Sequence, residues 1–488
     1  MILLFTVIGF IIYLPVLGNG FLSDDYDSLY RIYIQKRILY REFLRPMIDL
    51  SFYLNYLVSG LSPRSYYVFN ITVHIINAIL VFRFASKYTL FTKKNQFEFA
   101  VISGFLFLIY PFHNESIAWL SGRLSSMACL FALICLIIAN ESTSKKSTFI
   151  SGFLYLAGLL CYESIIFLPA IIIILAWTKE RSVKKLFTTG LFWLTTTALY
   201  LITRYVVSGE INGNYGDRLL DSHVKQKILN SGKVFGRLFL PGSENQTLLV
   251  VMSCVIFLGV LYTLWIVFKK KNINRDEKSN YTVLVVFLII SLIIPVAFGV
   301  STRTSEGDRL LYFPSCFLCM LIAGSVILIS KHKVYRVITL SVISIYFICF
   351  LEKNNLQWEK ASKAAYTILQ SIRNQRSGNT ILINTPDELE GAYVFRNGLV
   401  KALMIYKMDT SRIKIINYLK RKDYLRTGKV IPAKMLDSTV IIYPDIRIVI
   451  HDDQSLQFTN TQNNSSLNLR KDRNLIYYWN KEDLIRLF

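Results

Sequence analysis

Long apolar runs divide the sequence, and they constrain the fold more than any other feature. They extend for roughly 17 to 23 residues, the length that an α-helix needs to cross about 30 Å of hydrocarbon. Only helices and closed barrels satisfy their backbone hydrogen bonds in lipid, and runs of this length are helical. With 53% hydrophobic residues, the 488-residue chain is too apolar for an ordinary soluble enzyme. The sequence therefore predicts a mostly α-helical, polytopic transmembrane bundle.

Eleven segments are candidate membrane spans. They are 2–19, 67–86, 99–112, 124–140, 148–161, 164–178, 186–206, 246–268, 282–300, 310–329 and 334–351. The amphipathic stretch 44–60 is a candidate helix along the membrane interface. After about Leu351 the composition becomes polar, so we expect a transmembrane domain over 1–351 and a small α/β domain over 352–488.

Basic residues follow every second predicted span, and this pattern predicts the orientation. Lys87, Lys145, Lys179, Lys269 and Lys333 belong to these basic segments. Cytoplasmic loops are enriched in Lys and Arg, so we expect the N-terminus inside and the alternate loops outside, together with the C-terminal domain.

The basic residues that give the net charge of +23 lie largely between the apolar runs, and no nucleic-acid recognition motif accompanies them. A nucleic-acid partner is therefore not expected.

The predicted outer loops carry ionisable residues close to the ends of spans. Such groups are costly at the edge of the hydrocarbon unless they are paired or functional. They come from four separate loops: Asp24, Asp25, His113, Glu115, Arg123, Glu163, Asp308 and Arg309. Their convergence predicts a site at the outer face of the membrane.

The cysteines show no metal-ligand spacing. The C-terminal part has no cysteine, so no disulfide framework is expected in that part.

Asp24 and Asp25 are adjacent carboxylates directly after the first predicted span. Each suppresses the ionisation of the other, so one of them is a competent base at neutral pH. The pair can alternatively help to hold a divalent cation, or form a solvated acidic loop without a chemical role. From these residues alone, the three interpretations remain open.

Two further groups of polar residues have both a functional and a structural interpretation. The segment 110–123 contains His113, Glu115 and Arg123, which suit anion binding but also fit an aromatic belt with a snorkelling arginine. In the second predicted span, Asn70, His74 and Asn77 share one helical face. For that face, interhelical hydrogen bonding is favoured over substrate contact.

A succession of short motifs covers the chain to about residue 320. In order they are Asp24–Asp25, Arg45–Pro46, Asn55–Tyr56, Asn70, His74, Asn77–Ala78, Pro111–Phe112–His113–x–Glu115, Ser121–Gly122–Arg123, Tyr162–Glu163, Arg204–Tyr205 and Asp308–Arg309–Leu310–Leu311–Tyr312. Their succession resembles the GT-C superfamily of integral membrane glycosyltransferases. The resemblance is greatest to transmembrane O-mannosyltransferases of the type that carries tetratricopeptide repeats, although this chain has no such repeats.

The resemblance implies a polyprenyl-phosphate sugar, such as a mannose donor, and an acceptor hydroxyl of a protein, glycan or lipid at the extracytoplasmic face. A phosphate leaves readily, so an inverting transfer chiefly needs one base and cations for the phosphate. Asp24 or Asp25 is the expected base, and Arg123 and Arg309 are the expected phosphate ligands. The expected cavity lining consists of His113, Glu115, Glu163, Asp308 and Arg204.

No cofactor is required by this scheme, and a Mg²⁺ or Mn²⁺ ion is an optional addition. The competing hypothesis is a transporter or flippase for a lipid-linked saccharide. Such a protein would place charges near the membrane midplane and would show paired half-helices and an internal repeat. The sequence instead places its charges at one edge of the membrane and has no internal repeat.

Overall fold

A computed structural model describes most of the chain. The described residues are 1–91, 93–142, 144–180, 183–209, 224–270, 273–330, 332–373, 379–416, 418–419, 434–436, 439–442, 446–450, 455–460, 466–470, 474–479 and 484–486. The chain divides into two compact units. One consists of Met1–Gly18 with Arg37–Leu356, and the other of Asn19–Lys36 with Gln357–Phe488.

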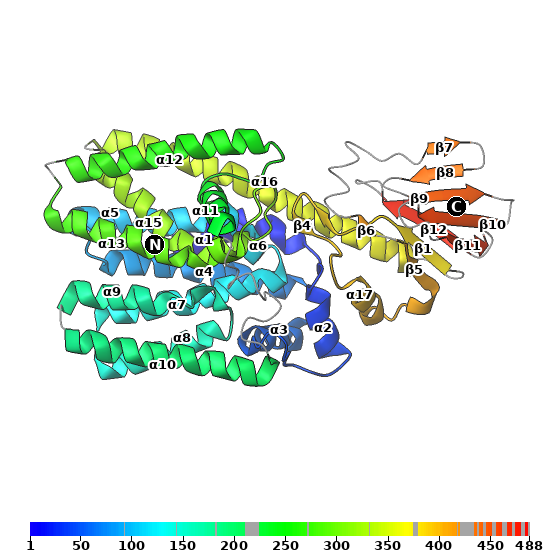
Figure 1. Ribbon diagram of the computed structural model, residues 1–488, viewed down its shortest axis with the longest axis horizontal. Helices are drawn as coiled ribbons and strands as arrows, with labels where there is room; N and C mark the ends of the chain where they lie inside the picture. Colours follow the sequence, from blue (N-terminus) through cyan, green and yellow to red (C-terminus); the bar gives the residue numbers. More distant parts are fainter. Residues whose placement is uncertain are drawn as a thin grey trace. The chain divides into compact units, whose positions relative to one another are not determined.

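The first unit is a bundle of helices (Figure 1). They are α1 (Ile2–Ile12), α3 (Pro46–Ser59), α4 (Arg64–Lys87), α5 (Lys93–Leu108), α6 (Asn114–Ile117), α7 (Arg123–Glu141), α8 (Lys145–Leu159), α9 (Leu168–Glu180), α10 (Val183–Ser208), α11 (Val224–Arg237), α12 (Gln246–Lys269), α13 (Arg275–Ser291), α14 (Ile293–Phe298), α15 (Tyr312–Ile329) and the first part of α16 (Lys333–Arg373). Short 3₁₀ turns join some of them: η1 (Leu14–Gly18), η2 (Pro111–His113), η3 (Leu120–Gly122), η4 (Glu163–Ile165) and η6 (Asp308–Leu311). A helix lies in every segment that the sequence predicts as a span, and α3 lies in the predicted interfacial stretch.

Six of the described helices are long and apolar enough to cross a membrane. They are Arg64–Lys87, Leu120–Glu141, Gln246–Lys269, Arg275–Phe298, Asp308–Ile329 and Lys333–Arg373. A seventh span results if Asn95–Leu108 and Pro111–Ile117, which are bent by 48°, are counted together. The chain is therefore a multi-pass membrane protein. The number of eleven spans and their orientation stay predictions, because Ile2–Ile12 and Glu163–Thr178 are apolar but shorter than these helices.

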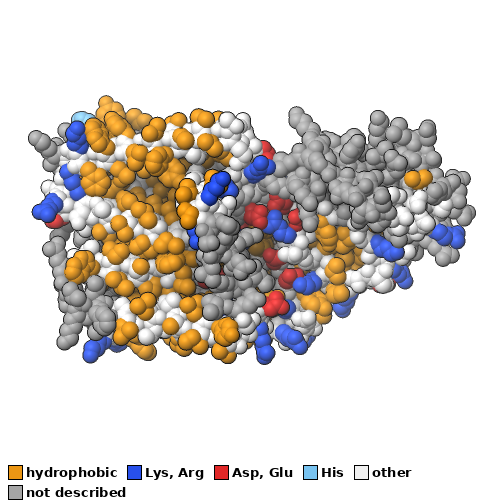
Figure 2. Space-filling model, in the orientation of Figure 1, with side chains coloured by type: hydrophobic (Ala, Val, Ile, Leu, Met, Phe, Trp, Pro, Cys, Tyr) orange, Lys and Arg blue, Asp and Glu red, His pale blue; other side chains and the backbone are white. Residues whose placement is uncertain are grey.

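Burial distinguishes the centre of the bundle from its rim. In α15, 83% of the most apolar window is buried, against 6% in α12 and 11% in α16. Many exposed side chains of the bundle are hydrophobic, and Figure 2 shows them gathered over the helical unit. Because lipid tails solvate apolar side chains, α12 and α16 are suited to face the bilayer while α15 packs against protein.

The polar face of α4 packs against neighbouring helices. His74 Nδ1 lies 2.7 Å from the Tyr312 hydroxyl, and Asn77 donates a 2.8 Å hydrogen bond to the Ser126 carbonyl. Asn70 is also fully buried and donates a 3.1 Å hydrogen bond to the Ile117 carbonyl at the end of α6. These bonds confirm the prediction that this face makes interhelical hydrogen bonds.

All the described strands belong to the second unit. They are β1 (Asn379–Ile383), β2 (Thr385–Pro386), β3 (Glu388–Leu389), β4 (Ala392–Tyr393), β5 (Ile413–Ile415), β6 (Tyr418–Leu419), β7 (Lys434–Leu436), β8 (Thr439–Ile442), β9 (Ile446–Ile450), β10 (Ser455–Asn460), β11 (Ser466–Arg470), β12 (Asn474–Trp479) and β13 (Leu484–Arg486). The unit also contains α2 (Asp25–Tyr33), α17 (Leu399–Ile405), the 3₁₀ turn η7 (Thr410–Arg412) and the last part of α16.

Two sheets organise these strands. The first has the order β13-β12-β1-β5, with β1 parallel to both of its neighbours and Ile381 opposite Ile476. The second is an antiparallel sheet with the order β11-β10-β9-β8-β7, in which consecutive strands are neighbours. Parallel pairing buries β1 on both faces, and Ile381, Leu382 and Ile383 are accordingly buried.

The packing of α5 on α4 depends on a glycine. A Cβ atom at Gly104 would lie 2.7 Å from Phe5 Cε2 and 2.8 Å from Phe82 Cβ, which is closer than carbon atoms approach. We therefore expect Gly104→Val to lower the free energy of unfolding by about 1–3 kcal/mol through overpacking. Thermal unfolding of the purified protein in detergent micelles measures this change. Gly259→Val in α12 is the matched control, because outside the local helix backbone no described residue has an atom within 4 Å of a Cβ there. Equal loss in both variants would contradict the packing argument.

Candidate active site

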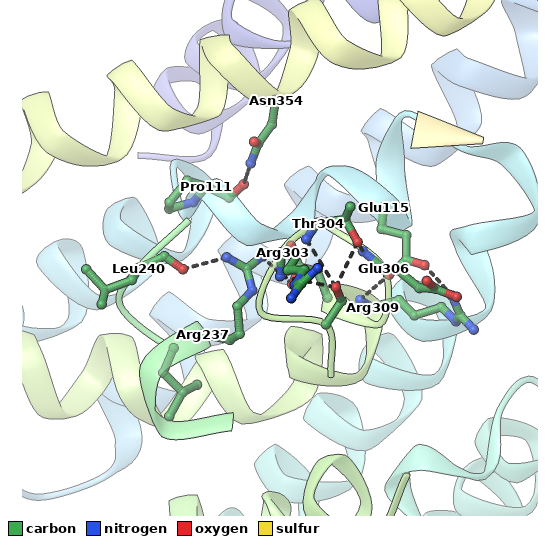
Figure 3. Close-up of polar contacts among 12 residues, drawn as sticks. Pro111, Glu115, Arg237, Leu240, Arg303, Thr304, Glu306, Arg309 and Asn354 are labelled. Atoms are coloured by element: carbon green, nitrogen blue, oxygen red, sulfur yellow. Dashed lines mark hydrogen bonds and ion pairs between the residues drawn. The ribbon is translucent and has the colours of Figure 1, made fainter. Parts of the chain in front are cut away.

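The turn after α14 determines where Arg309 lies. Gly299 has a φ of 79° and Gly307 a φ of 90°, and both values lie in the left-handed region that glycine adopts without strain. Between them, the Ser301 hydroxyl accepts a 3.1 Å hydrogen bond from the Thr304 backbone N–H. Figure 3 shows this turn beside Arg309. The turn therefore presents Arg309 on the short helix η6 in a defined direction.

Arg309 is held by a buried carboxylate. Its backbone N–H donates a 2.8 Å hydrogen bond to Glu115 Oε2, and its guanidinium pairs with Glu115 Oε1 (Figure 3). Glu115 is only 1% exposed, and the Arg309 guanidinium lies 5.6 Å from the centre of the Trp119 ring. A Cβ atom at Gly122 would collide with the Glu115 carbonyl oxygen, so this glycine allows the chain to turn tightly behind the carboxylate.

A second buried ion pair involves Asp308, the residue that precedes Arg309 in the sequence. Arg237 Nη2 lies 2.6 Å and 2.5 Å from the two carboxylate oxygens of Asp308, and Nη1 donates to the Leu240 carbonyl. The Arg237 guanidinium also lies 4.7 Å from the centre of the Phe112 ring. Because Asp308 and Arg309 are adjacent, the two pairs together connect α11, η6 and α6.

A cavity of about 910 Å³ opens beside Arg309. Its lining includes the side chains of Lys225, Lys227 and Lys233 from α11, together with Arg309 and one carboxylate, Glu306. Four cationic groups around one cavity favour an anionic ligand, and an arginine fork suits phosphate oxygens in particular. Of the residues predicted for the site, only Arg309 is among the described lining residues of this cavity.

Glu163 and Arg204, which the sequence predicts for the same site, lie together in a neighbouring cluster. Glu163 Oε1 lies 2.9 Å from Arg45 Nη2, and Glu163 Oε2 lies 3.5 Å from Arg204 Nη1. Burial raises the pKa of the Glu163 carboxyl, but Arg45 and Arg204 lower it further, so its pKa lies below the ordinary value. Tyr162 lines the cavity, and the Arg45 guanidinium lies 4.9 Å from the centre of the Tyr162 ring.

Arg123 and His113 are buried within the bundle. The Arg123 guanidinium is 4.4 Å from the centre of the Phe52 ring and donates a 2.7 Å hydrogen bond to Asn55 Oδ1. His113 Nε2 lies 2.7 Å from the Ser315 hydroxyl. These contacts place both side chains in structural surroundings, and their predicted roles toward a substrate stay predictions.

Asp24 and Asp25 belong to the second unit, and they differ in exposure. Asp25 is fully buried and its Oδ2 accepts a 3.0 Å hydrogen bond from the Leu22 backbone N–H. Asp24 is partly exposed and accepts a 2.8 Å hydrogen bond from Asn397 Nδ2. The preceding Ser23 has a φ of 46°, a left-handed conformation that is rare outside glycine and is often found at functional sites.

The turn that carries Asn397 brings this acidic segment into the second unit. Gly398 has a φ of 87°, and a Cβ atom there would collide with the Ser23 carbonyl oxygen. Ser23 in turn donates its backbone N–H to the Val394 carbonyl at 2.9 Å. The glycine is therefore required for the contact that orients Asp24, which agrees with a packing role for this part of the chain.

Comparison with known families identifies the chain. A model of the EpsG family matches residues 2–355. The chain belongs to the EpsG family. The match covers the helical unit together with Asp24, Asp25 and every other residue predicted for the site.

The EpsG-family protein is also similar in sequence to O-mannosyltransferases. It is 28% identical to protein O-mannosyl-transferase Tmtc1 of Drosophila melanogaster over 183 residues, which cover 33% of this chain and 21% of that protein. It is 28% identical to protein O-mannosyl-transferase TMTC3 of Homo sapiens over 125 residues, which cover 24% and 13%. The chain thus spans about a fifth or less of the length of these relatives. Together with the family membership, these matches confirm the resemblance to GT-C glycosyltransferases.

Among solved structures, the EpsG-family protein is similar to ArnT from Cupriavidus metallidurans bound to undecaprenyl phosphate. The TM-score is 0.45 with 10% sequence identity, and the alignment covers 88% of this chain and 96% of that chain.

The basic side chains of α11 are functional candidates that sequence reasoning missed. The segment is short and amphipathic, so it has no long apolar run. Its signal was the presence of Lys225, Lys227, Lys233 and Arg237 in a loop that the alternating pattern predicts on the outer side. Such basic residues are an exception to the orientation rule and are therefore candidates for a ligand. Arg45 is a further candidate of this kind, because in the sequence it is distinguished only as part of the Arg45–Pro46 motif.

The described residues of the EpsG-family protein contain no group of three or more His, Cys, Asp or Glu side chains that could hold a metal ion. Glu306 is the carboxylate in the described lining of the cavity, and the neighbouring Glu115 and Asp308 each pair with an arginine. A divalent cation at Glu115 or Asp308 would have to displace that arginine, so these two carboxylates do not fit a metal ion.

The pair of Arg237 and Asp308 is expected to stabilise the fold. Asp308→Asn removes the charge that compensates the buried Arg237, which should lower the free energy of unfolding by about 3–5 kcal/mol. Replacing both residues, by Arg237→Met with Asp308→Leu, should recover much of this loss because no buried charge remains. Glu244→Gln is the control, since Glu244 lies 3.8 Å from Arg303 in an exposed pair that contributes about 0–1 kcal/mol. Chemical unfolding in micelles measures all three, and equal effects of Asp308→Asn and Glu244→Gln would contradict the assignment.

Proposed function

We propose that this protein is a glycosyltransferase. In this proposal it moves a sugar, with mannose as the first candidate, from a polyprenyl-phosphate donor to an acceptor hydroxyl at the extracytoplasmic face of the membrane. The observation that carries it is the basic cavity of the helical unit, where Arg309 and three lysines surround a space large enough for a phosphate and a sugar. The similarity to O-mannosyltransferases and the membership of the EpsG family support the same activity.

The chemistry assigns different tasks to the cavity and to the acidic segment. The acceptor oxygen attacks the anomeric carbon, and the bond from that carbon to the phosphate oxygen breaks with its electron pair going to the phosphate. Arg309 and the lysines are proposed to stabilise the negative charge that develops on this leaving group. The phosphate needs no strong acid, so the remaining requirement is a base for the hydroxyl proton.

Asp24 is the proposed base, and Asp25 is proposed to hold its segment in place. This distinction is supported by exposure, because Asp24 is partly exposed whereas Asp25 is fully buried and accepts a backbone hydrogen bond. A substrate hydroxyl can reach a partly exposed carboxylate but not a fully buried one.

A transfer assay tests the function and the base together. Membranes that contain the protein are incubated with a polyprenyl-phosphate sugar labelled in the sugar, and loss of label from the lipid is followed. Asp24→Asn should reduce the rate by at least about 10²-fold, the usual contribution of a general base. Asp27→Asn should retain activity near the wild type, because Asp27 lies 2.9 Å from Lys401 and is not assigned a chemical role. If intact donor crosses the membrane and no label leaves the lipid, the protein is a transporter and the proposal is wrong.

The phosphate role of Arg309 has its own test. Arg309→Gln should lower kcat/KM for the donor by about 10²–10³-fold, because a charged donor to the leaving group is lost. Arg309→Lys should recover only part of the activity, since an ammonium group cannot present a fork. Arg303→Gln is the matched control, because Arg303 is exposed in the same turn and is not among the described cavity lining residues. A normal kcat/KM for Arg309→Gln in correctly folded protein would remove this assignment.

A further inference from the structure

Arg204 on α10 has one edge of its guanidinium that bonds no residue in the described part of the chain. The side chain is 2% exposed, and its Nη1 donates a 2.9 Å hydrogen bond to the Tyr200 hydroxyl. Among the described residues, no acceptor lies within hydrogen-bond distance of Arg204 Nε or Nη2. These two nitrogens form one edge of the guanidinium, with two N–H groups that point in parallel. The part of the arginine that best recognises an oxyanion is thus the part that none of the described residues bonds.

Such an arrangement is costly unless something bonds that edge. Buried donors in native proteins are almost always hydrogen-bonded, and a desolvated guanidinium needs its donors paired even more than a neutral group does. Two parallel N–H groups match two oxygens of one phosphate or carboxylate. The environment of Arg204 therefore points to an oxyanion as the missing partner.

A second arginine adds to this preference. Arg45, at the start of α3, lies 2.9 Å from the Glu163 carboxylate that also faces Arg204 at 3.5 Å. Two guanidinium groups thus share one carboxylate, which leaves a formal charge of +1 for the three side chains. A phosphate group has more oxygens than a carboxylate and carries them in tetrahedral directions, so it can accept from both arginines while Glu163 stays in place.

The cluster also borders the cavity. Arg45 lies against the ring of Tyr162, and Tyr162 is part of the cavity lining. Arg309, the arginine proposed to bind the donor phosphate, lines the same cavity and is held by a different carboxylate, Glu115. Arg309 therefore lines the cavity with Glu115 as its carboxylate, and Arg45 lies behind the lining residue Tyr162 with Glu163 as its carboxylate.

We propose that Arg204 and Arg45 form a second phosphate site, in which Arg204 Nε and Nη2 donate to two oxygens of one phosphate group. The proposal rests on the proposed function for its biological ligand. Two phosphate sites at one cavity suit a transfer in which the acceptor, like the donor, carries a phosphate. The substrate class inferred for the acceptor is accordingly a phosphate-bearing, lipid-linked saccharide.

The test measures how phosphate stabilises the full-length protein in detergent micelles. Polyprenyl phosphate and inorganic phosphate are titrated separately, and the rise in unfolding temperature gives an apparent affinity for each probe. Arg204→Met should weaken the affinity of this site by at least about tenfold, because two charge-assisted hydrogen bonds are lost. Without phosphate its unfolding temperature should change little, because Glu163 keeps its ion pair with Arg45 and the variant no longer buries a cation with unbonded donors.

Two further variants keep the test decisive. Arg204→Lys retains the charge but has no two-donor edge, so it should lose the same affinity. Arg83→Met is the matched control, because Arg83 is exposed and lies 3.7 Å from Glu141, and its phosphate response should equal that of the wild type. If both Arg204 variants bind both probes as the wild type does, or if Arg204→Met only lowers the unfolding temperature without phosphate, Arg204 is structural and the proposal is overturned.

The outcomes also separate the source of the phosphate and the two proposals. If only polyprenyl phosphate gives a response that depends on Arg204, the site is supported and its ligand is a lipid phosphate. If inorganic phosphate also gives such a response, the site is supported and a phosphate group without the lipid is enough for binding. A phosphate response that depends on Arg309 and is unchanged in both Arg204 variants would overturn this inference and leave the proposed function intact. Arg204-dependent binding in a protein that never releases sugar from the donor would support the site and overturn the glycosyltransferase.

Discussion

The paired charges of Glu115 with Arg309 and of Asp308 with Arg237 are the constraint on which the rest of the helical unit depends. Taking a charge out of water is costly, and these charges are retained inside the bundle because each has an opposite partner. The pairs connect three short elements that would otherwise be loops: α6, η6 and α11. They position both the arginine and the lysines that surround the cavity, so the electrostatic character of the cavity follows from them.

The arginines that the sequence predicts for the site divide into two kinds by the contacts they make. The Arg123 guanidinium bonds neighbouring protein groups and is enclosed by aromatic rings, which is how an arginine stabilises a fold. Arg309 is tied to a carboxylate and still reaches the cavity. Arg204 is buried, yet one edge of its guanidinium has no acceptor among the described residues. All three residues are arginines, a residue type that favours phosphate. Only the contacts around each guanidinium distinguish a structural role from a ligand-binding one.

Much of the secondary structure could be predicted from the sequence, and much of the site could not. A long apolar run is a local property, so each predicted span contains a helix. The segment of α11 was missed because its 14 residues are amphipathic rather than apolar. The partners of the site residues are equally invisible in the sequence, since Glu115 and Arg309 are 194 positions apart. The grouping of Asn19–Lys36 with Gln357–Phe488 likewise has no signal in the order of residues.

The sequence by itself determined that this is a multi-pass membrane protein with ionisable residues concentrated at the ends of its helices. These properties depend on composition and spacing, and any fold of the chain has to satisfy them because lipid cannot solvate a charge or an open backbone group. Only the tertiary structure decided which charge compensates which, that Arg309 reaches the cavity while Arg123 is enclosed, and that the Nε and Nη2 edge of Arg204 has no hydrogen-bond partner among the described residues. Pairing and burial arise between residues far apart in the chain, and therefore exist only once the helices have packed.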